Sequence, residues 1–124
     1  MDNLFEIYCP SFLITVDEPA LHGYTHGYIR SALQSCQFSD LMTYCCMCDE
    51  VMKSTGKLHT HAFVTFEHPV PASLLVFLLP FAHVGATSAS SWEIKNYILK
   101  KCSYKLLLEY EENLKDTFEE WRRT

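Results

Sequence analysis

The pattern of apolar and polar residues predicts four strands. Segment 58–66 alternates between apolar and polar positions and is rich in β-branched and aromatic residues, which is typical of a strand. The apolar run at 12–16 is a second strand that stops at an Asp-Glu-Pro loop, and 83–87 is short enough for an edge strand. Segment 41–51 is the fourth, and a Ser-Thr-Gly turn at 54–56 would join it to 58–66 as an antiparallel hairpin.

Two helices are predicted among these strands. Thr25 can cap the first one, and Ile29 and Leu33 lie at helical spacing along it. The second helix, 72–79, is apolar nearly all round, so we expect it to pack on the sheet. Pro80 ends this helix because a proline ring cannot continue it.

A third helix is predicted further along the chain. It begins at Ser90 or Ser91, where Glu93 completes a Ser-x-x-Glu capping box, and it runs to about Lys101. The mixed charges of 109–123 then indicate a solvated helix.

The order of these elements predicts an α+β fold, an antiparallel sheet of about five strands with helices packed on it. At 124 residues we expect one domain, with a core at about 10–105 and an acidic C-terminal segment at about 109–124. The longest apolar run, 72–84, is too short to span a bilayer, and the first residues carry no basic region of the kind that begins a secretory signal. We therefore expect no membrane segment and a cytoplasmic location.

Charge is unevenly distributed along the chain. Of a formal net charge of −5, more than half comes from the segment that starts at Glu109, where six acidic residues face three basic ones. Nucleic-acid binders are usually basic, and this chain is not. Any DNA contact must therefore depend on local basic residues such as Lys95, Lys100, Lys101 and Lys105, with weak non-specific affinity.

Six cysteines raise the question of a disulfide scaffold. Cys45, Cys46 and Cys48 crowd into one predicted strand, where adjacent and alternate positions are poorly placed to bridge one another. Without a secretory signal we expect the thiols to be reduced. A zinc site is disfavoured because the chain has no second C-x-x-C motif.

Two histidines and a carboxylate are the leading candidate for chemistry. Residues two apart in a strand point to the same face, so His59 and His61 would project side by side. The dipeptide Asp49-Glu50 ends the preceding strand, and hairpin pairing brings Glu50 within reach of both imidazoles. Such a set suits a divalent metal ion. The simpler alternative is two surface histidines beside a polar strand end.

A tyrosine and a lysine on the third predicted helix form the other candidate. Tyr97 and Lys100 are three residues apart and so share a helical face, where both could meet one phosphate. Ile94 and Ile98 would hold the other side of the helix in the core. The alternative is a core tyrosine with an exposed lysine, the usual meaning of an isolated Tyr-x-x-Lys.

Together these features resemble the endonuclease domain of rolling-circle replication initiators, the Rep proteins of the HUH superfamily in plasmids, phages and single-stranded DNA viruses. Three short motifs in the correct order are more specific than any one of them, and the resemblance covers about residues 12–121. The motifs are Phe12 to Pro19, Leu58 to Val64 and Asn96 to Lys100, with flanking similarity at 21–26 and 117–121.

The resemblance implies a metal-dependent enzyme that nicks and rejoins DNA. His59, His61 and Glu50 would bind Mn2+ or Mg2+, which would polarise the scissile phosphodiester. Tyr97 would be the nucleophile that forms a 5′-phosphotyrosine link, and Lys100 would steady the phosphate. The implied partner is single-stranded or hairpin DNA at a replication origin, in the cytoplasm of a host cell.

A second hypothesis stays open beside the nuclease. Asp17 stands where the family's first motif more often carries Asn, and a negative charge there would disfavour nearby DNA. The chain also contains no G-x-x-x-x-G-K-[ST] loop of the kind found in attached helicase domains. A phage or plasmid could instead have reused the Rep fold as a protein-binding module, for example an inhibitor of a host defence nuclease. Its acidic surface would then bind a host replication or defence protein.

Overall fold

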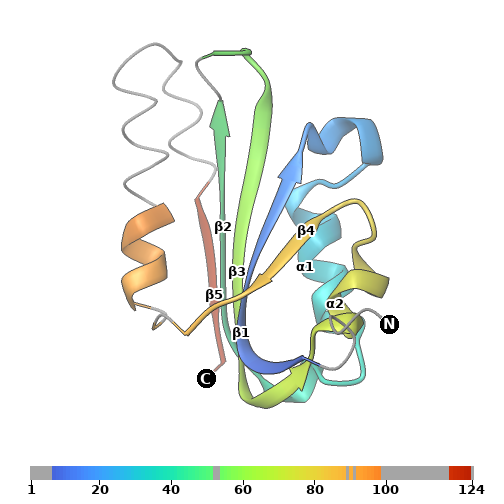
Figure 1. The fold of residues 1–124 in the computed structure, drawn as a ribbon, viewed down its shortest axis with the longest axis vertical. Helices are drawn as coiled ribbons and strands as arrows, with labels where there is room; N and C mark the ends of the chain where they lie inside the picture. Colours follow the sequence, from blue (N-terminus) through green and yellow to red (C-terminus); the bar gives the residue numbers. More distant parts are fainter. Residues whose placement is uncertain (1–6, 52–53, 89, 91, 99–117, 124) are drawn as a thin grey trace.

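A five-stranded antiparallel sheet with strand order β4-β1-β3-β2-β5 forms the centre of the fold (Figure 1). The computed structural model describes residues 7–51, 54–88, 90, 92–98 and 118–123. The predicted α+β class is confirmed, and so is the number of strands. The elements are β1 (Tyr8–Asp17), η2 (Pro19–His22), α1 (His26–Ser35), η3 (Ser39–Leu41), β2 (Met42–Val51), β3 (Leu58–Pro71), α2 (Ala72–Leu78), β4 (His83–Ala86) and β5 (Glu119–Arg122), with a further helical segment at 92–98.

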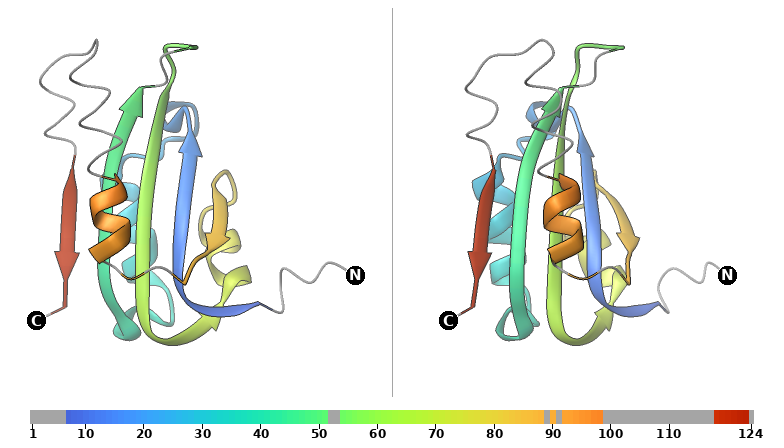
Figure 2. Two further views of the ribbon diagram at one scale, coloured as in Figure 1. Left: turned by 60° about the vertical axis from the view of Figure 1, so that its left-hand side comes forward. Right: turned by 90° about the vertical axis from the view of Figure 1, so that its left-hand side faces the viewer.

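The sheet has helices on both faces. Figure 2 shows α1 and α2 on one side, which we call the back face, and segment 92–98 in front of β2 and β3 on the other, the front face. Alternate residues of each strand divide between the two faces. Ile14 and Val64 belong to the core between the back face and its helices, whereas Phe63 packs with Ile94 and Ile98 on the front face.

Local sequence signals place α1 where they predicted it. The hydroxyl of Thr25 accepts a hydrogen bond from the backbone N–H of Tyr28, at 3.0 Å, and so caps the first turn. Ile29 and Leu33, at helical spacing, are fully buried. The apolar stripe of α1 thus faces the sheet.

The capping box of the third helix is also confirmed. The Ser90 hydroxyl accepts from the backbone N–H of Glu93 at 3.2 Å, and the Glu93 carboxylate accepts from the backbone N–H of Ser90 at 2.9 Å. Ile94 and Ile98, one turn apart, are buried against the front face together with Phe63. These contacts dock segment 92–98 on the sheet.

Helix α2 is less buried than its composition predicts. Ala72 and Leu75 are buried, and Leu79 follows the helix into the core before Pro80. The side chain of Phe77, by contrast, is 76% exposed. The side of α2 that carries Phe77 is therefore largely exposed to solvent. None of the described helices is long and apolar enough to cross a membrane.

The prediction of a solvated C-terminal helix is wrong for residues 119–122, which form the edge strand β5; the part of it at 109–117 lies outside the described residues. Trp121 lies opposite Cys45 of β2 and packs against the back-face core. The charged neighbours that suggested solvation are instead paired: Glu119 meets Arg30 of α1, and Glu120 meets Tyr44 of β2. A strand with an ion-paired residue on each face is hard to distinguish from a solvated helix by pattern alone.

The expectation of reduced thiols is wrong for one cysteine. Cys48 is disulfide-bonded, whereas Cys9, Cys36, Cys45 and Cys46 are free. Burial raises the pKa of Cys45 to about 12 and that of Cys46 to about 11. These two thiols therefore stay protonated at neutral pH, in keeping with a purely structural role in β2.

Truncating Ile98 tests the docking of segment 92–98. Ile98 is fully buried, so Ile98→Ala is expected to lower the free energy of unfolding by about 2 to 5 kcal/mol, measured by urea denaturation. Trp92 is 73% exposed on the same segment, and Trp92→Ala should change it by no more than about 0.5 kcal/mol. Equal effects of the two variants would contradict the docking.

Candidate functional site

Strand register brings the predicted metal ligands to one end of the front face. His59 of β3 lies directly between Asp17 of β1 and Glu50 of β2. Residues directly opposite in antiparallel strands share a face, and His61 lies two residues further along β3. The front face therefore carries two histidines and two carboxylates within three adjacent strands.

Glu50 and His61 form the buried half of this site. The Nε2 atom of His61 lies 2.7 Å from Oε1 of Glu50, and the exposed fractions of the two side chains are 11% and 3%. A carboxylate at this depth is costly unless it is paired and hydrogen-bonded. The imidazole of His61 meets that need, so the prediction that pairing brings Glu50 within reach of these histidines is confirmed for His61.

His59 is oriented by a different carboxylate. Its Nδ1 atom lies 3.1 Å from Oδ1 of Asp17, and Oδ2 of Asp17 lies 3.5 Å from Nε2 of His83 on β4. From sequence, Asp17 was only a departure from a family motif, and no role was predicted for His83. The signal for both lay in strand pairing, because Asp17 faces His59 and His83 faces Thr15.

Tyr97 lies on the helical segment that covers the same face. Its side chain is 49% exposed, while Ile94 and Ile98 of the same segment are buried in the cluster that contains Phe63 and Cys48. Cys48 is the strand partner of His61. The helix with Tyr97 and the strand with His61 therefore pack on the same part of the front face.

Of the basic residues proposed for DNA contact, Lys95 is the one that the structure describes. The Nζ atom of Lys95 lies 2.9 Å from Oε2 of Glu120, so this ammonium is already paired within the chain. Lys100, Lys101 and Lys105 lie outside the described residues.

The donor set fits a hard or borderline divalent cation in its chemistry. Two imidazoles and a carboxylate are ligands that Mn2+ accepts readily. Neighbouring ligand atoms about 2.1 Å from an octahedral ion lie roughly 3.0 Å apart, so the Glu50 and His61 atoms at 2.7 Å would need to separate only slightly. Within the described part of the chain, no three His, Cys, Asp or Glu side chains are already arranged as a metal cluster.

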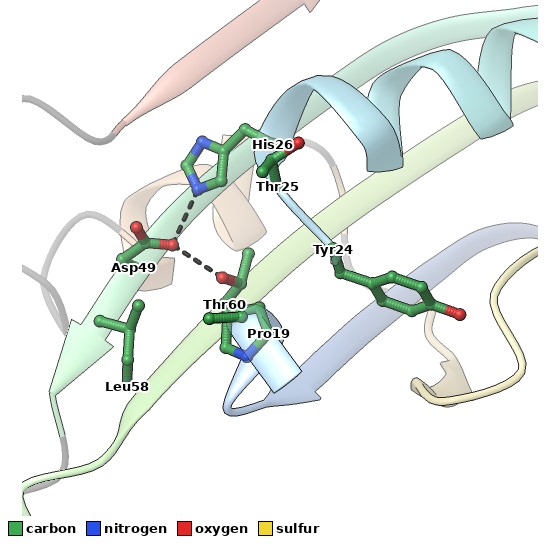
Figure 3. A pocket seen from close by; sticks show the side chains of 8 residues that line it. Pro19, Tyr24, Thr25, His26, Asp49, Leu58 and Thr60 are labelled. Carbon is green, nitrogen blue, oxygen red and sulfur yellow. Dashed lines mark hydrogen bonds and ion pairs between the residues drawn. The ribbon is translucent and has the colours of Figure 1, made fainter. Parts of the chain in front are cut away.

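A second histidine and carboxylate network lies on the back face, and sequence reasoning missed it. His26, the first residue of α1, places Nε2 2.7 Å from Oδ1 of Asp49 (Figure 3) and Nδ1 2.6 Å from Oε2 of Glu119. The hydroxyl of Thr60 donates to the same Asp49 oxygen at 2.7 Å, and Arg30 is ion-paired with Glu119. The network ties β5 to α1 and β2.

The two carboxylates favour a protonated His26. Both ring nitrogens face carboxylate oxygens, and each nitrogen can donate only in the imidazolium form. The hydrogen bond to Asp49 raises the pKa of His26, burial opposes this, and Glu119 adds to the rise. Burial would raise the pKa of Glu119, but hydrogen bonds from Arg30 and His26 outweigh it and lower that pKa. His26 is thus a charged link in this network.

A pocket of about 280 Å³ adjoins the network (Figure 3). Its polar side chains are engaged with one another, as the hydrogen bonds of Asp49 to His26 and Thr60 show. We therefore assign this pocket no ligand. It is lined by Pro19, Ala20, Tyr24, Thr25, His26, Asp49, Leu58 and Thr60.

No protein-family model matches the chain, and a search of curated proteins gives no significant match.

The His26 network predicts a pH-dependent stability. Because the pKa of His26 is raised in the folded state above the ordinary 6.5, its stabilising contribution is complete below pH 6.5 and is lost as the pH rises through the folded value. Thermal unfolding from about pH 6 to about pH 9 should therefore show the stability advantage of wild type over His26→Gln shrinking with pH.

The exposed His68 supplies the control for this measurement. The His26→Gln difference is expected to vary with pH more than the His68→Gln difference, because His26 lies between two carboxylates. A His26→Gln difference that does not vary with pH would argue against a charged His26.

Proposed function

We propose that this protein is a metal-dependent nuclease of the HUH class, which nicks and rejoins single-stranded DNA to initiate rolling-circle replication. The observation that supports this is the convergence of Glu50, His59 and His61 on one face of the sheet, the face on which the helical segment that carries Tyr97 also packs. A purely structural origin would not require two histidines and a buried carboxylate at the same strand ends.

Glu50, His59 and His61 would hold Mn2+ or Mg2+. When bound, such an ion polarises the scissile phosphodiester and offsets the negative charge that develops on its oxygens. The Glu50 side chain is 3% exposed and so lies in a low-dielectric environment. Its negative charge would therefore act on a bound ion with little screening by solvent.

Tyr97 would supply the nucleophile. Its phenolic oxygen attacks the phosphorus, the bond from phosphorus to the 3′-oxygen breaks, and the leaving 3′-oxygen takes up a proton while the phenol loses one. The product is a 5′-phosphotyrosine, which a 3′-hydroxyl can later attack to restore the DNA strand without an external energy source. The 49% exposure of Tyr97 suits a nucleophile that meets a macromolecular substrate.

The remaining assignments belong to residues around this centre. Lys100 lies three residues beyond Tyr97 in the sequence, outside the described residues, and would steady the phosphate. Lys95 is paired with Glu120, so its contribution to DNA binding would first require that ion pair to open. We therefore expect modest affinity, strongly reduced by salt, for DNA at an origin in the host cytoplasm.

A covalent-adduct assay tests the proposed chemistry. Incubation with 5′- and 3′-labelled single-stranded oligonucleotides, hairpins included, and Mn2+ should give a slow-migrating protein–DNA adduct on a denaturing gel. Tyr97→Phe should abolish the adduct because the attacking oxygen is lost. Tyr28, with 47% exposure on α1, is the matched control, and Tyr28→Phe should leave the yield unchanged.

His61→Ala should also remove the adduct while Tyr97 is present, since a metal ligand is lost. An adduct of undiminished yield from Tyr97→Phe would sink the assignment of the nucleophile. No adduct from a randomised oligonucleotide pool would instead favour the second candidate function.

The second candidate is a protein-binding module on the same fold, and an aromatic surface on the back-face helices favours it. Phe77 and Phe81 are 76% and 59% exposed. Tyr28 lines a groove with Phe77 and stacks on Tyr24, which in turn contacts Phe81 at 6.1 Å between ring centroids. Groups of exposed aromatic side chains of this kind mark protein contacts.

This surface replaces the acidic one that the sequence suggested for the binding role. Glu119 is paired with Arg30 and Glu120 with Lys95, so both carboxylates are already neutralised by contacts within the chain. The double variant Phe77→Ser with Phe81→Ser should abolish co-purification of a host protein if binding is the function, and leave any DNA adduct intact. Retention of the same partner by the double variant would contradict this use of the surface.

A further inference from the structure

We propose that Asp17 is a positioning residue for the metal centre. Its carboxylate holds the Nδ1 side of His59, so that Nε2 of that ring is presented as the metal-binding atom. This inference rests on the proposed metal centre. It assigns a role to a carboxylate that lies outside the ligand set of Glu50, His59 and His61.

The charge that faces His59 supports this assignment. The Oδ1 atom of Asp17 lies 3.1 Å from Nδ1 of His59, and a carboxylate at this distance favours the proton on the nitrogen that faces it. In a neutral imidazole the lone pair then lies on the other nitrogen, Nε2. Among the described residues, the His59 ring makes no other ion pair and no hydrogen bond, so this lone pair is available to a cation.

Asp17 lies between two histidines. Strand pairing places it opposite His59 on β3, and its second oxygen lies 3.5 Å from Nε2 of His83 on β4, at the sheet edge. The His83 side chain is 76% exposed, so this outer contact is weak. His83 therefore contributes little to the position of Asp17, whose placement opposite His59 follows from strand pairing.

The two candidate ligand histidines are oriented by different groups. His61 meets Glu50, which is itself a proposed ligand, whereas His59 meets a carboxylate that is not. Loss of the Asp17 charge should therefore loosen His59 alone and leave the buried pair of His61 and Glu50 in place. This separation makes the role of Asp17 testable.

Glu18 provides a control that distinguishes positioning of the His59 ring from general electrostatic attraction of the cation. Any carboxylate near a cation strengthens binding by its charge alone. Glu18 follows Asp17 in the chain, but its carboxylate lies 3.6 Å from Lys57 and it makes no contact with His59 in the described structure. Glu18→Gln thus removes the same charge at nearly the same place without disturbing the ring.

The first measurement is Mn2+ affinity of the full chain by electron paramagnetic resonance of the free ion. Asp17→Asn is expected to weaken binding by about 10- to 100-fold, the usual effect of losing a carboxylate behind a ligand histidine. Glu18→Gln should stay within about twofold of wild type, since the Glu18 carboxylate faces Lys57 and makes no contact with His59. Asp17→Glu, which keeps the charge but shifts the carboxylate, should restore binding only in part.

The second measurement follows the tautomer of His59 by nitrogen-15 NMR without metal. Wild type should show the proton on Nδ1, and Asp17→Asn should shift the ring toward a mixture of tautomers, because a neutral amide holds the proton less firmly. The His61 signals should stay unchanged, which also shows that the variant is folded. A merely structural Asp17 would not produce this pattern.

The outcomes separate the inference from the function on which it rests. If His61→Ala abolishes Mn2+ binding but Asp17→Asn leaves it and the His59 tautomer unchanged, the metal centre stands and the role of Asp17 is overturned. Equal losses from Asp17→Asn and Glu18→Gln would also overturn it, in favour of general attraction. If wild type binds no Mn2+, both the centre and the positioning role fail.

Discussion

The antiparallel register of β3 with its two neighbours is the constraint on which the rest of the structure depends. Side chains alternate between faces, so a slip of one residue would turn His59 and His61 toward the back-face helices and expose Ala62 and Val64. Burial of the apolar set therefore holds the register, and the register in turn places the polar set. The same register therefore specifies both the apolar packing of the back face and the polar residues of the candidate site on the front face.

Adjacent residues of β2 show how this constraint sends neighbouring side chains to opposite faces of the sheet. Asp49 and Glu50 are neighbours in the chain, yet Asp49 meets His26 on the back face and Glu50 meets His61 on the front face. Each carboxylate is matched to an imidazole, which lowers the cost of burying its charge. The front pair belongs to the candidate metal centre, whereas the back pair helps to join β5 to the rest of the fold through Glu119.

Net charge turns out to be a poor guide to the charge that a ligand would meet. The chain carries a formal charge of −5, but Glu119 and Glu120 are neutralised by Arg30 and Lys95 within the fold. The local field at the front face depends on the few side chains gathered there, and a cation among Glu50, His59 and His61 would reverse its sign. The acidic composition and a polyanionic substrate are thus compatible in physical terms.

Short windows of sequence determined the elements and much of the candidate site. Strand alternation, the Thr25 cap and the capping box at Ser90 act over a few residues, and β2 and β3 are close enough in the sequence for their pairing to set Glu50 opposite His59. Only the tertiary structure decided that 119–122 is a strand, because its charges look solvated until distant residues pair with them.

The contact of Asp17 with His59 was also decided by tertiary structure. These residues belong to β1 and β3, which are neighbours in the sheet although β2 lies between them in the chain. No local turn sets that pairing, whose register depends on burial of apolar side chains from both strands. Sequence thus identified the candidate ligands, whereas the sheet order decided which carboxylate faces which histidine.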